Sequence, residues 1–124
     1  MDQISQFIST LLASRNQAHI FHWQVDGPGS YAAHKALNKY YDEILEATDE
    51  LVESYQGRYG IIKGYTSPAT FKEDDQYITY FEALSKYVET ARKTIVTQDT
   101  YIQNQIDEIV KLIETTKYKL KYLH

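Results

Sequence analysis

The sequence predicts an all-α fold, a four-helix bundle in a single domain that covers residues 1–124. Its 124 residues are enough for one ordinary domain and too few for two. Glycine (5) and proline (2) are scarce, which argues against a β-protein with many turns. Apolar residues recur at steps of three, four and seven along long segments, and this spacing is typical of the buried face of an α-helix.

The first predicted helix runs from Gln3 to Val25. Residues 26–29, Asp-Gly-Pro-Gly, cannot continue a helix and predict a tight connection. Ser30 is the expected N-cap of the second helix, which extends to Gln56. The expected inward stripes are Ile4, Ile8, Leu11, Ala18 and Val25, widened by Phe7 and Leu12, in the first helix, and Leu37, Tyr41, Ile44, Thr48, Leu51 and Tyr55 in the second.

A long linker at residues 57–70, interrupted by glycines and a proline, precedes the second half of the chain. We expect the third helix at Phe71–Val96 and the fourth at Tyr101–Leu123. The expected inward residues are Ile78, Phe81, Leu84, Val88, Ala91 and Ile95, then Ile102, Ile106, Ile109, Ile113 and Leu120.

The pattern of short, long and short connections bears on topology. If extended at about 3.3 Å per residue, the middle linker could span the whole length of the bundle. That crossover is typical of ferritin-like bundles. An up-down-up-down bundle with one loose loop is the alternative.

Composition narrows the classes of function. The chain has no cysteine, which excludes disulfides and thiolate metal sites. No apolar run approaches the roughly 20 residues of a membrane helix, and the start of the sequence lacks the basic residues of a signal peptide. We therefore expect a cytoplasmic protein without a membrane partner. A net charge of −4 gives no general attraction to nucleic acid.

One polar stripe of the second predicted helix does not fit a purely structural role. At 100° per residue, its members share an arc of about 100° beside the apolar stripe. They are His34, Asn38, Asp42, Asp49 and Glu53. His22 lies on the inward stripe of the first helix and is expected to point inward. Imidazoles and carboxylates suit iron, manganese or zinc, although a solvated acidic face and a core histidine are the structural alternatives.

Spacing divides these residues into two half-sites. His34 and Glu53 are about 28 Å apart along one helix, so they cannot share an ion within one chain. His22 and His34 flank the tight turn and can meet. A two-fold axis crossing the middle of the second helix would bring the histidines of one chain to the carboxylates of another. A ferritin-type site within one chain is excluded because the sequence has no Glu-x-x-His pair.

The segment His-Trp-Gln-Val-Asp-Gly-Pro that begins at His22, followed by His34 and the pair Asp49 and Glu53, resembles the Dps mini-ferritins (DNA-binding proteins from starved cells). The family carries its second histidine twelve residues after the first. Its Asp-x-x-x-Glu pair begins fifteen residues later, as it does here. The resemblance extends over essentially all four predicted helices.

The resemblance implies a ferroxidase that oxidises Fe(II), with hydrogen peroxide as a favoured oxidant, and stores ferric mineral in a spherical dodecamer. It implies that His22 and His34 bind iron from one subunit and that Asp49 and Glu53 bind it from the partner, with Glu53 bridging. Trp23 would lie beside the site and could trap or relay an oxidising equivalent. Other divalent metals such as Zn²⁺ or Mn²⁺ suit the same ligands. The implied role is iron storage and protection against oxidative stress.

The sequence departs from the family pattern in three ways. Asn38 replaces an expected aspartate, which should lower the affinity for Fe(II), and Asp42 one turn later is a candidate replacement. The lysine-rich N-terminal tail is missing, which argues against DNA binding. The linker is short and is expected to lack a small helix that lies at the family's dimer interface, so assembly can differ from a dodecamer.

Two further interpretations stay open from the sequence. The alternative function is a ferritin-like helical oligomer without ferroxidase activity, in a structural or partner-binding role, and Asn38 favours it. His19, one turn before His22, is interpreted as structural or as support for the site.

Overall fold

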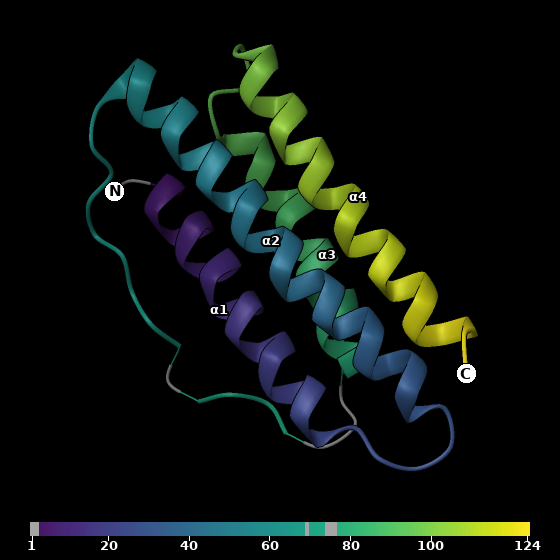
Figure 1. Cartoon of the computed structure of the whole chain (residues 1–124). Coiled ribbons are helices and arrows are strands. Elements are labelled where there is room, and N and C mark those ends of the chain that lie inside the picture. Colours follow the sequence, from purple (N-terminus) through teal and green to yellow (C-terminus); the bar gives the residue numbers. More distant parts are fainter. Residues whose placement is uncertain (1–2, 69, 74–76) are drawn as a thin grey trace.

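Four α-helices pack against one another in the described part of the chain, residues 3–68, 70–73 and 77–124 of a computed structural model (Figure 1). They are α1 (Gln3–Gln24), α2 (Ser30–Tyr59), α3 (Tyr77–Ala91) and α4 (Thr100–Tyr122), with a 3₁₀ turn, η1, at Arg92–Thr94. The described residues contain no β-strand. The predicted all-α class with four packed helices is confirmed.

The boundaries of α2 differ from the prediction at both ends. Ser30 is the first helical residue rather than the N-cap, which is Gly29 with a φ of 82°. A left-handed φ of this kind favours glycine because it has no Cβ. α2 also continues through Gly57 and ends at Tyr59, with Gly60 as its C-cap, where φ is 99°. A single glycine inside a long, packed helix costs only about 1 kcal/mol, so Gly57 did not end it.

α3 is shorter than the predicted Phe71–Val96, and its N-terminal limit has a tertiary cause. Residues 70–73 are not helical, and residues 74–76, which the prediction also included, lie outside the described residues. The buried side chain of Gln17 accepts a hydrogen bond from the Lys72 N–H (2.6 Å) and donates one to the Lys72 carbonyl (2.9 Å). Both backbone groups of Lys72 are therefore engaged by α1.

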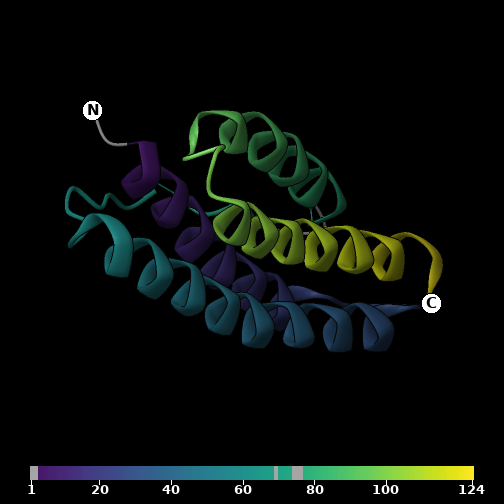
Figure 2. The ribbon, with the colours of Figure 1, turned by 90° about the horizontal axis from the view of Figure 1, so that it is seen from above.

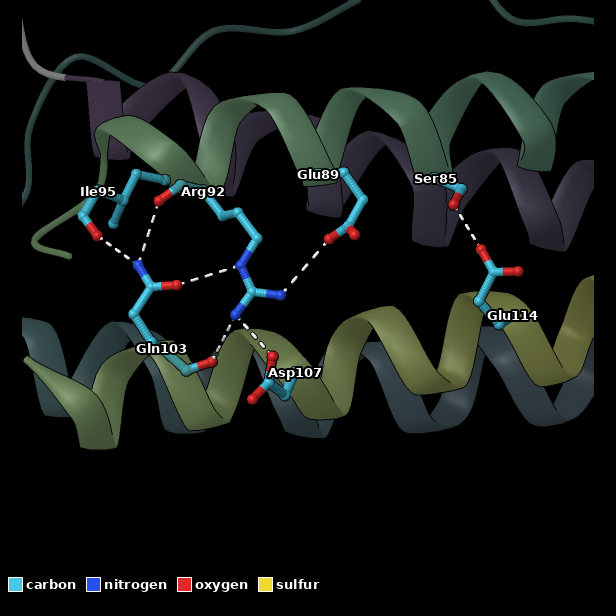
Figure 3. Close-up of polar contacts among 7 residues, drawn as sticks. All are labelled: Ser85, Glu89, Arg92, Ile95, Gln103, Asp107 and Glu114. Carbon is cyan, nitrogen blue, oxygen red and sulfur yellow. Dashed lines mark hydrogen bonds and ion pairs between the residues drawn. The ribbon is translucent and has the colours of Figure 1, made fainter.

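At its other end α3 tightens into η1 and is tied to α4 (Figure 3). The Arg92 guanidinium donates to Asp107 Oδ1 at 2.6 Å and to the Gln103 carbonyl at 3.1 Å. The Gln103 side-chain amide donates in turn to the carbonyl of Ile95, at 2.7 Å, where the chain has left the helix. These bonds fix the short turn between α3 and α4.

The linker after α2 runs back along α1 to the opposite end of the bundle (Figure 1). Thr66 N–H donates to Ser9 Oγ at 2.9 Å, and the contacts of Lys72 with Gln17 follow farther down α1. As a result α2 and α3 run in the same direction. Figure 2 shows the two layers that this produces, α1 with α2 and α3 with α4. The linker is thus an ordered crossover rather than a loose loop, and its described residues contain no helix, as expected.

The interior between the helices is mostly apolar, and Tyr40 is the largest of its fully buried side chains in the described residues. Tyr40 is fully buried, and its hydroxyl donates to Ser14 Oγ at 2.7 Å, while Ser14 donates to the Leu11 carbonyl. Burial raises the pKa of the Tyr40 phenol. One inward prediction needs correction, because Leu12 is exposed, whereas Tyr41 is half-buried and packs against the core. None of the described helices is long and apolar enough to cross a membrane.

The Gln17 contact predicts how the crossover is held. Gln17→Ala should destabilise the fold by about 1–3 kcal/mol, because two partly buried backbone groups of Lys72 lose their partner. Hydrogen exchange of the linker amides should speed up. Ser9→Ala, which removes one bond to Thr66, is the milder comparison. Unchanged exchange in Gln17→Ala would show that the crossover is held by other contacts.

Candidate metal site

The two histidines meet at the turn between α1 and α2. His22 Nδ1 lies 2.9 Å from the carbonyl oxygen of His34, and His34 Nδ1 lies 3.1 Å from the carbonyl oxygen of His22. The two rings stack with centroids 3.6 Å apart and planes inclined by 24°. The expected meeting of these side chains is confirmed. His22 is half-buried, and its ring packs against His34 and Tyr41 of α2.

These reciprocal hydrogen bonds fix the proton on each ring. A carbonyl oxygen can only accept, so Nδ1 is the donor in both neutral imidazoles. Each Nε2 therefore carries the free lone pair. A backbone carbonyl that orients one ring nitrogen while the other binds metal is the usual support of a histidine ligand in proteins.

The stacked arrangement also limits how many ions the pair can bind. The lone pair of an imidazole nitrogen lies in the plane of its ring. Two stacked rings with centroids 3.6 Å apart do not direct both in-plane lone pairs at one ion about 2.0–2.1 Å away, so the two rings suit two ions.

Asn38 links two neighbours on the same helix. The Tyr41 hydroxyl donates to Asn38 Oδ1 at 2.6 Å, and Asn38 Nδ2 donates to Asp42 Oδ2 at 3.2 Å. Both ends of the Asn38 amide are therefore engaged, and Asp42 is held toward the histidine end of α2. Tyr41 was predicted only as an inward residue, and its hydrogen bond to Asn38 was not predicted. The spacing of three residues between them could have indicated it, because such residues are neighbours on a helix surface.

Three aromatic side chains surround the pair. His19 stacks on Tyr41 with centroids 4.2 Å apart and lies 4.3 Å from the Trp23 ring. Partial burial, followed by electrostatic repulsion from His22 and Arg15, lowers the pKa of His19. Trp23 is 68% exposed, so the cluster ends in a large apolar side chain facing solvent.

Asp49 and Glu53 lie apart from this cluster on the exposed side of α2. His34 and Asp49 are separated by about 22 Å along the helix. The two carboxylates line a groove of about 250 Å³, together with Ile8, Leu12, Thr48, Val52 and Tyr65. Within the described residues of one chain, no group of three or more histidine, aspartate or glutamate residues could hold a metal.

Comparison with known proteins gives one match. A family model described as a family of unknown function, DUF5856, matches residues 22–120. The matched range begins at His22 and includes both half-sites. No curated protein and no solved structure matches the chain.

The hydrogen bonds predict the same tautomer for both histidines. In their neutral form, His22 and His34 should carry the proton on Nδ1. Nitrogen-15 NMR of the metal-free protein distinguishes the two ring nitrogens directly. Spectra with the proton on Nε2 of either ring would contradict the orientation described here.

Proposed function

Because the chain belongs to the DUF5856 family, whose function is unknown, its activity is inferred from its own residues, and we propose that it is a Dps-like mini-ferritin. It oxidises and sequesters iron at a site shared between two subunits. In the cytoplasm, this activity protects against the reaction of Fe(II) with peroxide. The observation that carries the proposal is the His22–His34 pair, stacked and with both Nε2 lone pairs free.

The topology supports a ferritin-like bundle as part of this proposal. A long crossover that returns along α1 and makes α2 and α3 run in the same direction is the connection of ferritin-like folds. In the described residues, the interior holds no histidine or glutamate, and its one carboxylate, Asp99, lies at the start of α4. A metal centre inside the bundle is therefore not part of the proposal.

The missing ligands come from a second subunit. A two-fold axis across α2, midway between the histidines and the carboxylates, superposes each half-site on the other half-site of the partner. His22 and His34 of one subunit then face the partner's Asp49 and Glu53. The two subunits form two equal sites. Such dimers assemble further, and the form of the Dps mini-ferritins is a dodecamer.

Iron is the substrate of this site. Two imidazole nitrogens and two carboxylates provide borderline and hard ligands, and the carboxylates favour Fe(III) over Fe(II). Two Fe(II) ions each lose one electron to one molecule of hydrogen peroxide, whose O–O bond breaks to give two hydroxide ions. Glu53, with two oxygens and a long side chain, is the ligand best able to bridge the ions. The same donors accept Zn²⁺ or Mn²⁺.

Asn38 determines how strongly the second ion is held. As a neutral amide it contributes one oxygen and no charge, and that oxygen already accepts the Tyr41 hydroxyl. Asp42 supplies the nearest negative charge of the same half-site and is held by the Asn38 amide. The departure from the family pattern thus weakens Fe(II) binding and leaves the histidine pair intact.

Asn38 also favours a second candidate function. Without a carboxylate beside the histidines, a ferritin-like oligomer can keep its fold and lose ferroxidase activity, serving as a structural or partner-binding assembly. Oxidation no faster than in a protein-free control would favour this alternative.

Anaerobic loading with Fe(II), followed by hydrogen peroxide, tests the proposal. We expect rapid ferric absorbance that saturates at about two iron ions per shared site, then slower growth of soluble mineral. Glu53→Gln should slow the rapid phase at least about tenfold, because each site loses a charged ligand. Glu50→Gln, an equally exposed change on α2 outside both half-sites, is the matched control. Equal rates for these two variants would contradict the assigned ligands.

A further inference from the structure

The face formed by α1 and α2 exposes large apolar side chains. Trp23 is 68% exposed, Leu12 38% and Leu45 37%. Trp23 follows Leu12 by eleven residues, which places the two within about 20° of each other around α1. Leu45 lies within about 20° of Asn38 around α2 by the same arithmetic. The apolar side chains thus share one face with both half-sites.

The groove beside Asp49 and Glu53 lies on this face, and most of its lining residues are apolar. Its apolar residues are Ile8, Leu12, Val52 and Tyr65, the last supplied by the crossover linker. Thr48 also lines the groove, and its Oγ1 is itself buried.

The two-fold axis of the proposed site determines which residues of a second copy lie opposite this groove. Midway between His34 and the two carboxylates, the axis crosses α2 about one turn before Leu45. The hydrogen bonds of His22 with His34 place Trp23 level with the start of α2, about 14 Å from the axis. The groove lies at a similar distance on the other side, around Thr48 and Val52. Rotation by 180° therefore brings Trp23 of one subunit level with the groove of the other subunit along α2.

We propose that Trp23 of one subunit packs into the groove between Leu12, Val52 and Tyr65 of a second copy of this chain. The inference rests on the proposed function for the position of the axis. An apolar cavity of about 150 Å³ is enough for benzene, so a groove of about 250 Å³ accommodates an indole. The indole N–H is a donor without acceptor capacity, and the exposed carboxylates of Asp49 and Glu53 provide acceptors.

Self-complementarity makes a second copy the occupant. Each chain offers one protruding indole and one groove, so a two-fold pair fills both grooves and leaves neither indole in water. Leu12 and Leu45 of the two copies then lie near the axis and form an apolar centre. The contact also explains how the dimer forms without a helix in the described part of the linker, since Tyr65 supplies part of the wall.

The single tryptophan of the sequence makes the contact directly measurable. Emission and acrylamide quenching of the metal-free protein are recorded with a chelator present, alongside sedimentation over a range of concentrations. We expect the emission to shift to shorter wavelength and quenching to fall at least about twofold as the dimer forms. Trp23→Asp and Leu12→Asp should each weaken dimerisation at least about tenfold, because they alter the centre of the interface. Circular dichroism checks that both exposed substitutions leave the helices intact.

Tyr122→Asp, at an equally exposed aromatic residue near the end of α4, should leave dimerisation and emission unchanged. A dimer whose Trp23 stays open to acrylamide overturns the inference without touching the iron test, and a chain that stays monomeric also overturns it. A buried Trp23 in a protein that does not oxidise iron supports this contact and contradicts the proposed function instead.

Discussion

The fixed rise of a straight helix is the constraint on which the site depends. Fifteen residues of α2 place His34 and Asp49 about 22 Å apart, and no side chain can bridge that distance. The histidines and the carboxylates on the α1–α2 face therefore work together only if two chains contribute. In the proposed dimer, the same rise sets the position of the two-fold axis and brings Trp23 level with the partner's groove. The proposed metal site and the proposed contact of Trp23 therefore depend on the same helix.

Contacts within a single chain hold the side chains of the histidine half-site and the linker beside the carboxylates. Backbone carbonyls near the turn between α1 and α2 hold the two imidazoles, and Asn38 holds Asp42. On the other side, Ser9 and Gln17 hold the crossover linker that brings Tyr65 to the groove. These contacts within one chain would reduce the entropy lost if the proposed shared site is assembled from two subunits.

Hydrophobic periodicity was enough to predict four helices and most of the core, because apolar stripes at helical spacing need only be buried. It failed where tertiary contacts decide. The start of α3 depends on Gln17, which binds the Lys72 backbone from 55 residues away. The fully buried Tyr40 was not predicted, and Tyr41 packs against the core while its hydroxyl reaches Asn38. The meeting of His22 and His34 followed from the short turn, but the stacking of their rings depends on how α1 and α2 pack, which periodicity does not determine.

Subunit mixing tests most directly the central claim that each site is shared. His34→Ala and Glu53→Ala should each abolish rapid Fe(II) oxidation, because each substitution damages both sites of its own dimer. After exchange of subunits, confirmed by mass spectrometry, a mixed dimer keeps one site with all its ligands. We expect part of the rapid oxidation to return in the mixture. Exchanged dimers that stay inactive, when unsubstituted protein is active under the same conditions, would contradict a site built from two chains.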